Sequence, residues 1–72
     1  MSHNNIMFAK RLKELRIEKG LTQQQLADIL KVDRTTVMKW ERGERETNFS
    51  MLAKIAKYFE TTSDYLIGIT DY

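Results

Sequence analysis

The side chains best suited to chemistry fall within one short segment in the middle of the chain. Arg34 and Lys39 can donate to the O6 and N7 atoms of guanine, and arginine can do so through two hydrogen bonds at once. Thr35 and Thr36 can hydrogen-bond to a base or place a methyl group against thymine, whereas Met38 can make only apolar contact. Side chains of these types are able to contact base edges in duplex DNA, and such contacts would favour some G·C content in a bound site.

Catalytic chemistry is not favoured. Asp28 and Asp33 could suggest acid–base work, but a surface role and a helix-cap role explain them more simply. The sequence has no nucleophile beside a general base, no cluster of metal ligands and no glycine-rich phosphate loop. We therefore expect a protein that is not an enzyme and that uses no metal, no cofactor and no small-molecule substrate.

Length and composition predict one small domain over residues 1–72. A chain of this size buries only about 60% of the surface that its unfolded form exposes, so an enclosed catalytic pocket is not expected. Cysteine and proline are absent and there are three glycines, a composition that suits helices with short connections. No apolar run approaches the roughly 20 residues of a membrane span, and no signal peptide is visible. The expected location is the cytoplasm, without membrane contact.

The charge distribution is more informative than the net charge of +2. Residues 1–45 carry ten lysines and arginines against six acidic residues, whereas residues 46–72 carry two against four. The first part could face a polyanion, although a solvated lysine-rich surface would give the same counts. The segment KRLKELR, residues 10–16, could likewise contact DNA directly or form a solvated helix face.

Apolar periodicity and capping residues predict five helices, over residues 5–19, 23–30, 34–42, 49–59 and 63–67. Thr22 and Gln25 have the spacing of a capping box at the start of the second helix. Asp33 is expected to cap the third helix, and its charge suits the positive end of the helix dipole. Asn48 and Thr62 are the expected caps of the last two helices. Glycines stand at three of the expected helix ends: Gly20, Gly43 and Gly68.

The second and third helices are expected to form a unit that presents a polar outer face. Only residues 31–33 separate them, which forces a sharp angle, and Ala27 is small enough for the third helix to pass closely. Val37 and Trp40 share one face of the third helix and are expected to be buried, which leaves its opposite face in solvent. The alternative for Trp40 is a stacking platform for a base.

Three segments carry a family resemblance: GLTQQQLADIL (20–30), VDRTTVMKWERG (32–43) and LAKIAKYFETTSDYLIG (52–68). In this order and spacing they resemble the Cro/C1-type (XRE-like) helix-turn-helix family of phage repressors and related bacterial regulators. The resemblance covers about residues 8–68. It implies an all-α, five-helix bundle of the lambda-repressor-like DNA-binding type, with the helix-turn-helix proper at about 22–42. It also implies a transcriptional regulator, a repressor of phage or mobile-element type, that binds double-stranded DNA as a homodimer.

The same resemblance implies roles for individual residues. Thr22 and Gln23 would lie at a DNA phosphate, with Gln23 also bracing the start of the third helix. The family's base-facing positions hold Arg34, Thr35, Thr36, Met38 and Lys39, and its phosphate-contacting loop positions hold Arg42 and Arg45. Arg16 and Glu41 match a structural ion pair of the family, so Arg16 is not expected at a phosphate and Glu41 needs no catalytic role.

One departure from the family lies in the turn before the third helix. Lys31 occupies a position where the family prefers glycine. A lysine there must either adopt a left-handed backbone conformation, which costs about 1 kcal/mol, or alter the turn.

The C-terminal end carries more apolar residues than a short helix needs for docking. We expect Leu66 to face the core, with Tyr65, Ile67 and Ile69 at a dimer interface, because relatives often pair through this end. The simpler alternative is that Tyr65 and Leu66 only close the core.

The alternative function is a protein-interaction module with the same fold, such as an antitoxin or the partner of another regulator.

Overall fold

The computed structural model describes residues 3–71, and its helices are those that the sequence predicts. They are α1 (His3–Glu18), α2 (Gln23–Leu30), α3 (Arg34–Glu41), α4 (Phe49–Tyr58) and α5 (Ser63–Ile67), with no strand in the described range. The bounds of α2 and α5 agree with the prediction. The helix α1 begins two residues earlier than predicted, and α1, α3 and α4 each end one residue earlier.

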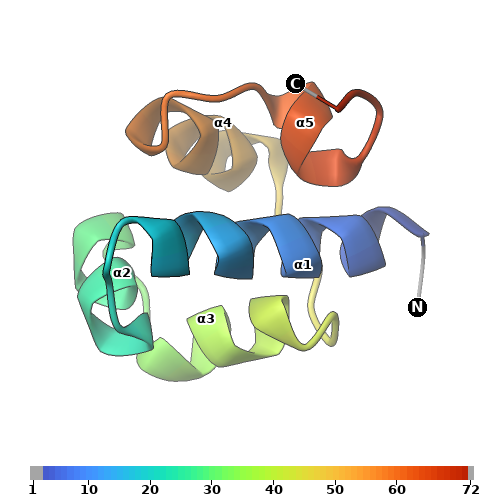
Figure 1. The fold of residues 1–72 in the computed structure, drawn as a ribbon. Helices are drawn as coiled ribbons and strands as arrows, with labels where there is room; N and C mark the ends of the chain where they lie inside the picture. The colour runs from blue at the N-terminus through green and yellow to red at the C-terminus, as the bar shows by residue number, and fades with distance from the viewer. Residues whose placement is uncertain (1–2, 72) are drawn as a thin grey trace.

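The long helix α1 lies in the middle of the molecule. The helices α2 and α3 lie on one side of it, and α4 and α5 lie on the opposite side (Figure 1). The connection from α3 to α4 therefore crosses from one layer to the other. This arrangement leaves one surface of α3 without a covering element.

The core is built from side chains of all five helices. Phe8 of α1 meets Trp40 of α3 edge-on, with ring centroids 6.1 Å apart and planes at 77°, a favourable aromatic geometry. Trp40 is only 4% exposed, which confirms the core role predicted for it rather than the stacking role. The largest completely buried side chains are Leu12, Leu26, Leu30, Val37, Ile55 and Leu66.

The helix caps follow the prediction except at α3. The backbone N–H of Gln25 donates to Thr22 Oγ1 at 3.0 Å, and the N–H of Thr22 donates to Gln25 Oε1 at 2.8 Å, so the capping box at α2 is confirmed. Asp33 is the N-cap residue of α3 as predicted, but the expected side-chain cap is wrong, because its carboxylate accepts no amide of that helix. The amide of Thr36, which a side-chain cap would use, donates at 3.0 Å to the backbone carbonyl of Asp33 instead.

Lys31 keeps the turn between α2 and α3 by adopting a strained backbone conformation. Its φ and ψ angles are 60° and 45°, in the left-handed region. The amide of Val32 donates to the carbonyl of Ala27 at 2.9 Å, which closes the end of α2. Of the two alternatives for this position, the chain therefore adopts the left-handed one, at a cost of about 1 kcal/mol relative to glycine.

Arg11 ties α1 to the C-terminal end of the described chain. Its guanidinium donates to the backbone carbonyls of Tyr65 and Thr70, the latter at 2.6 Å, and lies 4.2 Å from the centroid of the Tyr65 ring. It also lies 3.4 Å from the Asp71 carboxylate. The side chain of Arg11 is 12% exposed and is used inside the protein. For this residue, the two interpretations of the segment 10–16, a solvated helix face and contact with DNA, are therefore both wrong.

Two kinds of feature are absent from residues 3–71. None of the helices has the length and apolar character needed to cross a membrane. Among residues 5–71, whose side chains the structure describes, no three acidic side chains gather closely enough to hold a metal ion.

Candidate nucleic-acid interface

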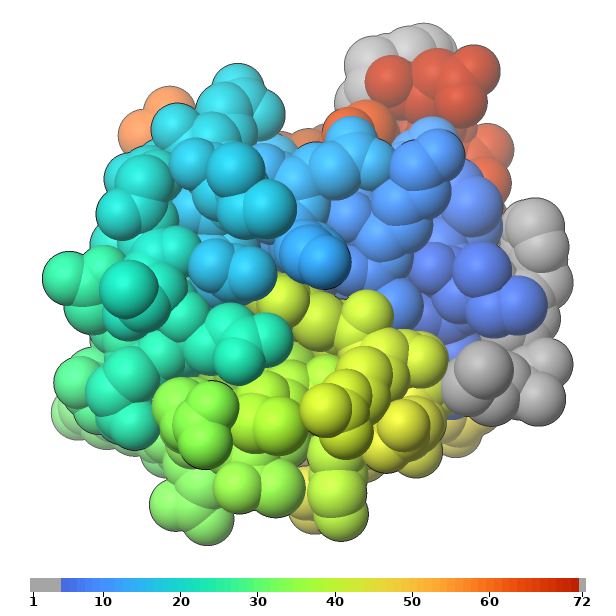
Figure 2. All heavy atoms as spheres, turned by 60° about the horizontal axis from the view of Figure 1, so that its bottom comes forward, coloured from blue at the N-terminus to red at the C-terminus, as the bar shows by residue number. Residues whose placement is uncertain are grey.

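The outer surface of α3 carries exposed polar and basic side chains. Arg34, Thr35 and Lys39 are exposed, whereas Val37 and Trp40 on the opposite face are buried. Figure 2 shows this surface of the molecule, with α3 and the following loop side by side. Because a helix repeats every 3.6 residues, burial of one face by Val37 and Trp40 directs these three side chains outward. Thr36 and Met38, at the edges of the same surface, are half-buried.

The loop that follows α3 adds two further arginines beside this surface. Arg42 and Arg45 are both exposed. The Nη1 atom of Arg45 lies 3.4 Å from Thr36 Oγ1, which brings the loop next to the first turn of α3. Gly43, with a φ of 72°, turns the chain away from the helix. The guanidinium of Arg45 thus lies close to the Thr36 hydroxyl at the edge of the outer surface of α3.

A buried ion pair holds α3 to α1 behind this surface. Arg16 Nε donates to Glu41 Oε2 at 2.7 Å and Arg16 Nη2 donates to Glu41 Oε1 at 3.1 Å. The side chains of Arg16 and Glu41 are 12% and 4% exposed. Arg16 Nη1 also donates to the carbonyl of Leu21 at 2.8 Å, so this guanidinium is used within the protein. The two-bond geometry adds directional specificity to the contact between α1 and α3.

Gln23 joins the same network from α2. Its Nε2 atom donates to Glu41 Oε1 at 3.1 Å. The expectation that Gln23 braces the start of α3 is therefore wrong, because Glu41 is the last residue of that helix. Thr22, one residue earlier, is exposed and its hydroxyl accepts the Gln25 amide. The capping box uses the amides of Thr22 and Gln25 and not that of Gln23 at the start of α2.

The three residues predicted at a dimer interface do not share one environment. Leu66 is fully buried as predicted. Tyr65 is half-buried with its ring against Arg11, Ile67 is half-buried, and Ile69 is 65% exposed. The prediction missed Phe49, which at 91% is the most exposed large apolar side chain among those that the structure describes. Phe49 stands three residues before Leu52 and seven before Ala56, at the edge of the apolar stripe of α4, so helical spacing gave no signal that it is exposed.

The fold and this surface define a DNA-binding helix-turn-helix protein: two eight-residue helices joined by three residues, with the second presenting exposed polar side chains. The model of the helix-turn-helix family HTH_3 matches residues 12–66. The chain belongs to this family, whose members are transcriptional regulators rather than enzymes. The predicted family and fold are thereby confirmed.

Known proteins similar to this chain include a transcriptional activator and a transcriptional repressor. It is 45% identical over 61 residues to the HTH-type transcriptional activator BcrR of Enterococcus faecalis, covering 85% of this chain and 30% of BcrR. It is 28% identical over 53 residues to the cryptic phage CTXphi transcriptional repressor RstR of Vibrio cholerae, covering 74% of this chain and 48% of RstR. The chain thus spans less than half the length of either protein.

A solved structure of nearly the same size is also similar. It is the restriction-modification controller protein C.AhdI from Aeromonas hydrophila, with a TM-score of 0.78 and 34% identity. The match covers 90% of this chain and 98% of C.AhdI. The five-helix arrangement is therefore shared with a protein of similar length.

Proposed function

We propose that the protein binds double-stranded DNA sequence-specifically, with α3 in the major groove. The observation that carries this proposal is the exposure of Arg34, Thr35 and Lys39 on a helix whose opposite face is anchored in the core. The major groove of B-DNA admits an α-helix and displays a distinct pattern of donors and acceptors for each base pair. A rigidly held helix with outward hydrogen-bonding groups is suited to that groove.

The exposed groups divide into two roles. Arg34 and Lys39 would donate to base edges, with arginine able to bind guanine through two bonds, while Thr35, Thr36 and Met38 would contact neighbouring bases. Arg42 and Arg45, together with the start of α2 at Thr22 and Gln23, would contact phosphates, which fixes the position of the protein but carries no sequence information. Arg16 belongs to neither group, because its donors are used inside the protein.

We propose further that the bound form is a homodimer on a nearly palindromic site. Two copies of α3 in successive major grooves lie about 34–36 Å apart. The Cα extents of the chain are 27 × 25 × 21 Å, so two copies side by side are compatible with that spacing. Isolated half-sites would then bind more weakly than paired ones.

The proposed effect on transcription is repression. A dimer that covers a promoter blocks polymerase by occupying the site and needs no further contact, whereas activation needs a surface that engages polymerase. The relatives include the repressor RstR at 28% identity and the activator BcrR at 45% identity, so the proposal of repression rests on the occupancy argument. In vitro transcription from a promoter bearing the bound site would decide: rising protein concentration should reduce transcript, and an increase would overturn repression.

The experiment that tests DNA binding begins with selection of bound sites from a random duplex pool. The selected duplex and a scrambled duplex are then titrated at two salt concentrations. Binding should weaken steeply with salt because each phosphate contact releases counterions. Arg34→Ala should reduce the preference at one base position by about 1–3 kcal/mol, and Arg45→Ala should weaken both duplexes about equally. No detectable binding at low salt would overturn the proposed function.

A further inference from the structure

The carboxylate of Asp33 is free, although the residue stands directly before α3. Asp33 is exposed and has an extended backbone, with φ and ψ of −76° and 150°. The amides of Thr36 and Val37 donate to its backbone carbonyl at 3.0 and 3.4 Å, so the first turn of α3 closes without the side chain. Among residues 5–71 the carboxylate forms neither a hydrogen bond nor an ion pair. Both of its oxygens therefore remain available as acceptors.

Asp33 also stands at the end of α3 that a bound duplex would meet. The recognition helix of a helix-turn-helix protein contacts base edges through its N-terminal residues. Arg34, the first residue of α3 and the first of its proposed base-facing residues, follows Asp33 directly. Neighbouring Cα atoms lie about 3.8 Å apart, close to the ~3.4 Å between successive bases of one strand. Once Arg34 reaches a base edge, Asp33 is therefore within reach of an adjacent base pair.

The chemistry of a carboxylate restricts the base that it can contact. A carboxylate accepts hydrogen bonds and donates none. In the major groove only cytosine N4 and adenine N6 donate, whereas guanine N7 and O6 and thymine O4 are acceptors and would repel it. Adenine places its N7 acceptor beside N6, so a carboxylate there meets one repulsive atom. Cytosine offers its donor without such an atom and is the favoured partner.

We propose that Asp33 reads a cytosine by accepting a hydrogen bond from its N4 amino group, in the base pair next to the one that Arg34 contacts. This contact rests on the proposed insertion of α3 into the major groove and adds one base position to it. The same negative charge repels phosphates, and on a duplex without the cytosine no contact offsets that repulsion. Asp33 thus strengthens binding to the correct site relative to all others by disfavouring the wrong ones.

Asp33→Asn tests the contact, with Asp64→Asn as its matched control. Asparagine keeps the size of the side chain and is an equally good N-cap residue, but its amide suits the N6 and N7 atoms of adenine. Asp64 is exposed on α5, in the layer opposite α3 (Figure 1), so its substitution makes the same change of charge away from the proposed DNA contact. Selection from a random duplex pool gives the preferred base at each position for the wild type and both variants. Circular dichroism checks that each keeps the wild-type fold.

The wild type should select cytosine at one position, and Asp33→Asn should select adenine there with every other position unchanged. Titration of two duplexes that differ only at this position should show a preference of about tenfold for cytosine in the wild type and its reversal in Asp33→Asn. Asp64→Asn should select the wild-type sequence and keep the tenfold preference.

Asp33→Ala separates base reading from simple repulsion. It should bind the cytosine duplex and its substituted partner about equally, and it should bind a scrambled duplex more tightly than the wild type does. Selection of the wild-type base at every position by Asp33→Asn overturns the proposal. Tighter binding of Asp33→Ala to all duplexes by one common factor does so as well, because the carboxylate would then only repel phosphates. Failure of the proposed function looks different, since neither the wild type nor Asp64→Asn would enrich any sequence.

Discussion

Replacing Glu41 with glutamine tests whether the buried ion pair determines the stability of the helix-turn-helix. Glu41 accepts two bonds from Arg16 and one from Gln23, so its carboxylate joins α1, α2 and α3. Glutamine keeps the size of the side chain but removes the negative charge. Arg16 would then hold a positive charge at 12% exposure without its partner.

The expected loss follows from this burial. Removing one partner of a buried pair costs about 3–5 kcal/mol, and we expect about 3 kcal/mol because glutamine can still accept a bond from Arg16. The total stability of a chain of this size is of the order of 4–11 kcal/mol. In a protein this small each kcal/mol lowers the Tm by about 4–8 °C, so Glu41→Gln should lower it by about 12–24 °C.

Thermal unfolding followed by far-ultraviolet circular dichroism provides the measurement. Glu44→Gln is the control, since Glu44 is exposed and lies just beyond the same helix. A double variant, Arg16→Met with Glu41→Leu, should recover much of the lost stability, because it leaves no uncompensated charge. A loss below about 1 kcal/mol in Glu41→Gln, or a double variant no more stable than the single one, would refute this reasoning.

Four further substitutions have defined outcomes in urea unfolding. Lys31→Gly should raise the free energy of unfolding by about 1 kcal/mol with an unchanged m-value, since it relieves a left-handed lysine; no gain would mean that the turn is not strained. Thr22→Ala should lower it by about 1 kcal/mol, while Asp33→Ala should cost clearly less because its carboxylate accepts no amide; equal losses would contradict this contrast. Leu12→Ala should cost about 2–5 kcal/mol because Leu12 is fully buried, and a smaller loss would indicate that the core collapses into the cavity.

The helices could be predicted because the signals that bound them are local. The capping box of Thr22 and Gln25 depends on residues three positions apart, and the apolar stripe of α4 needs only helical periodicity. The same holds for the burial of Val37 and Trp40, which follows from their spacing on one short helix. Family resemblance added the pairing of Arg16 with Glu41 across 25 positions, which no local pattern contains.

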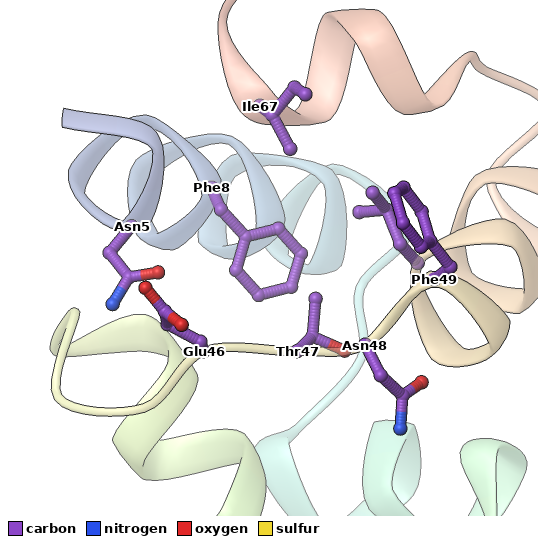
Figure 3. A pocket seen from close by; sticks show the side chains of 8 residues that line it. Asn5, Phe8, Glu46, Thr47, Asn48, Phe49 and Ile67 are labelled. Carbon is purple, nitrogen blue, oxygen red and sulfur yellow. The ribbon is translucent and has the colours of Figure 1, made fainter. Parts of the chain in front are cut away.

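The features that were missed depend on how distant segments meet. Arg11 lies in a basic run whose composition resembles a solvated helix face, and its carbonyl partners lie 54 and 59 positions away. A groove of about 540 Å³ beside Phe49 arises where α1, the 46–48 loop, α4 and α5 come together (Figure 3), so neither its volume nor the exposure of Phe49 can be inferred from one helix. Asp33 stands at the N-cap of α3 as predicted, but the Thr36 amide donates to its carbonyl and not to its carboxylate, a local choice between two acceptors.

The ring of Phe8 lines the groove and also meets Trp40 of α3 edge-on. Within each copy of the proposed dimer, only packed core side chains therefore separate α3 from the other layer of the molecule. In such a dimer no flexible linker can absorb a change in the distance between half-sites. One base pair inserted at the centre of the site would shift one half-site by about 3.4 Å and rotate it by about a tenth of a turn. The length of the spacer between half-sites would then be part of the recognised sequence, although no side chain touches it.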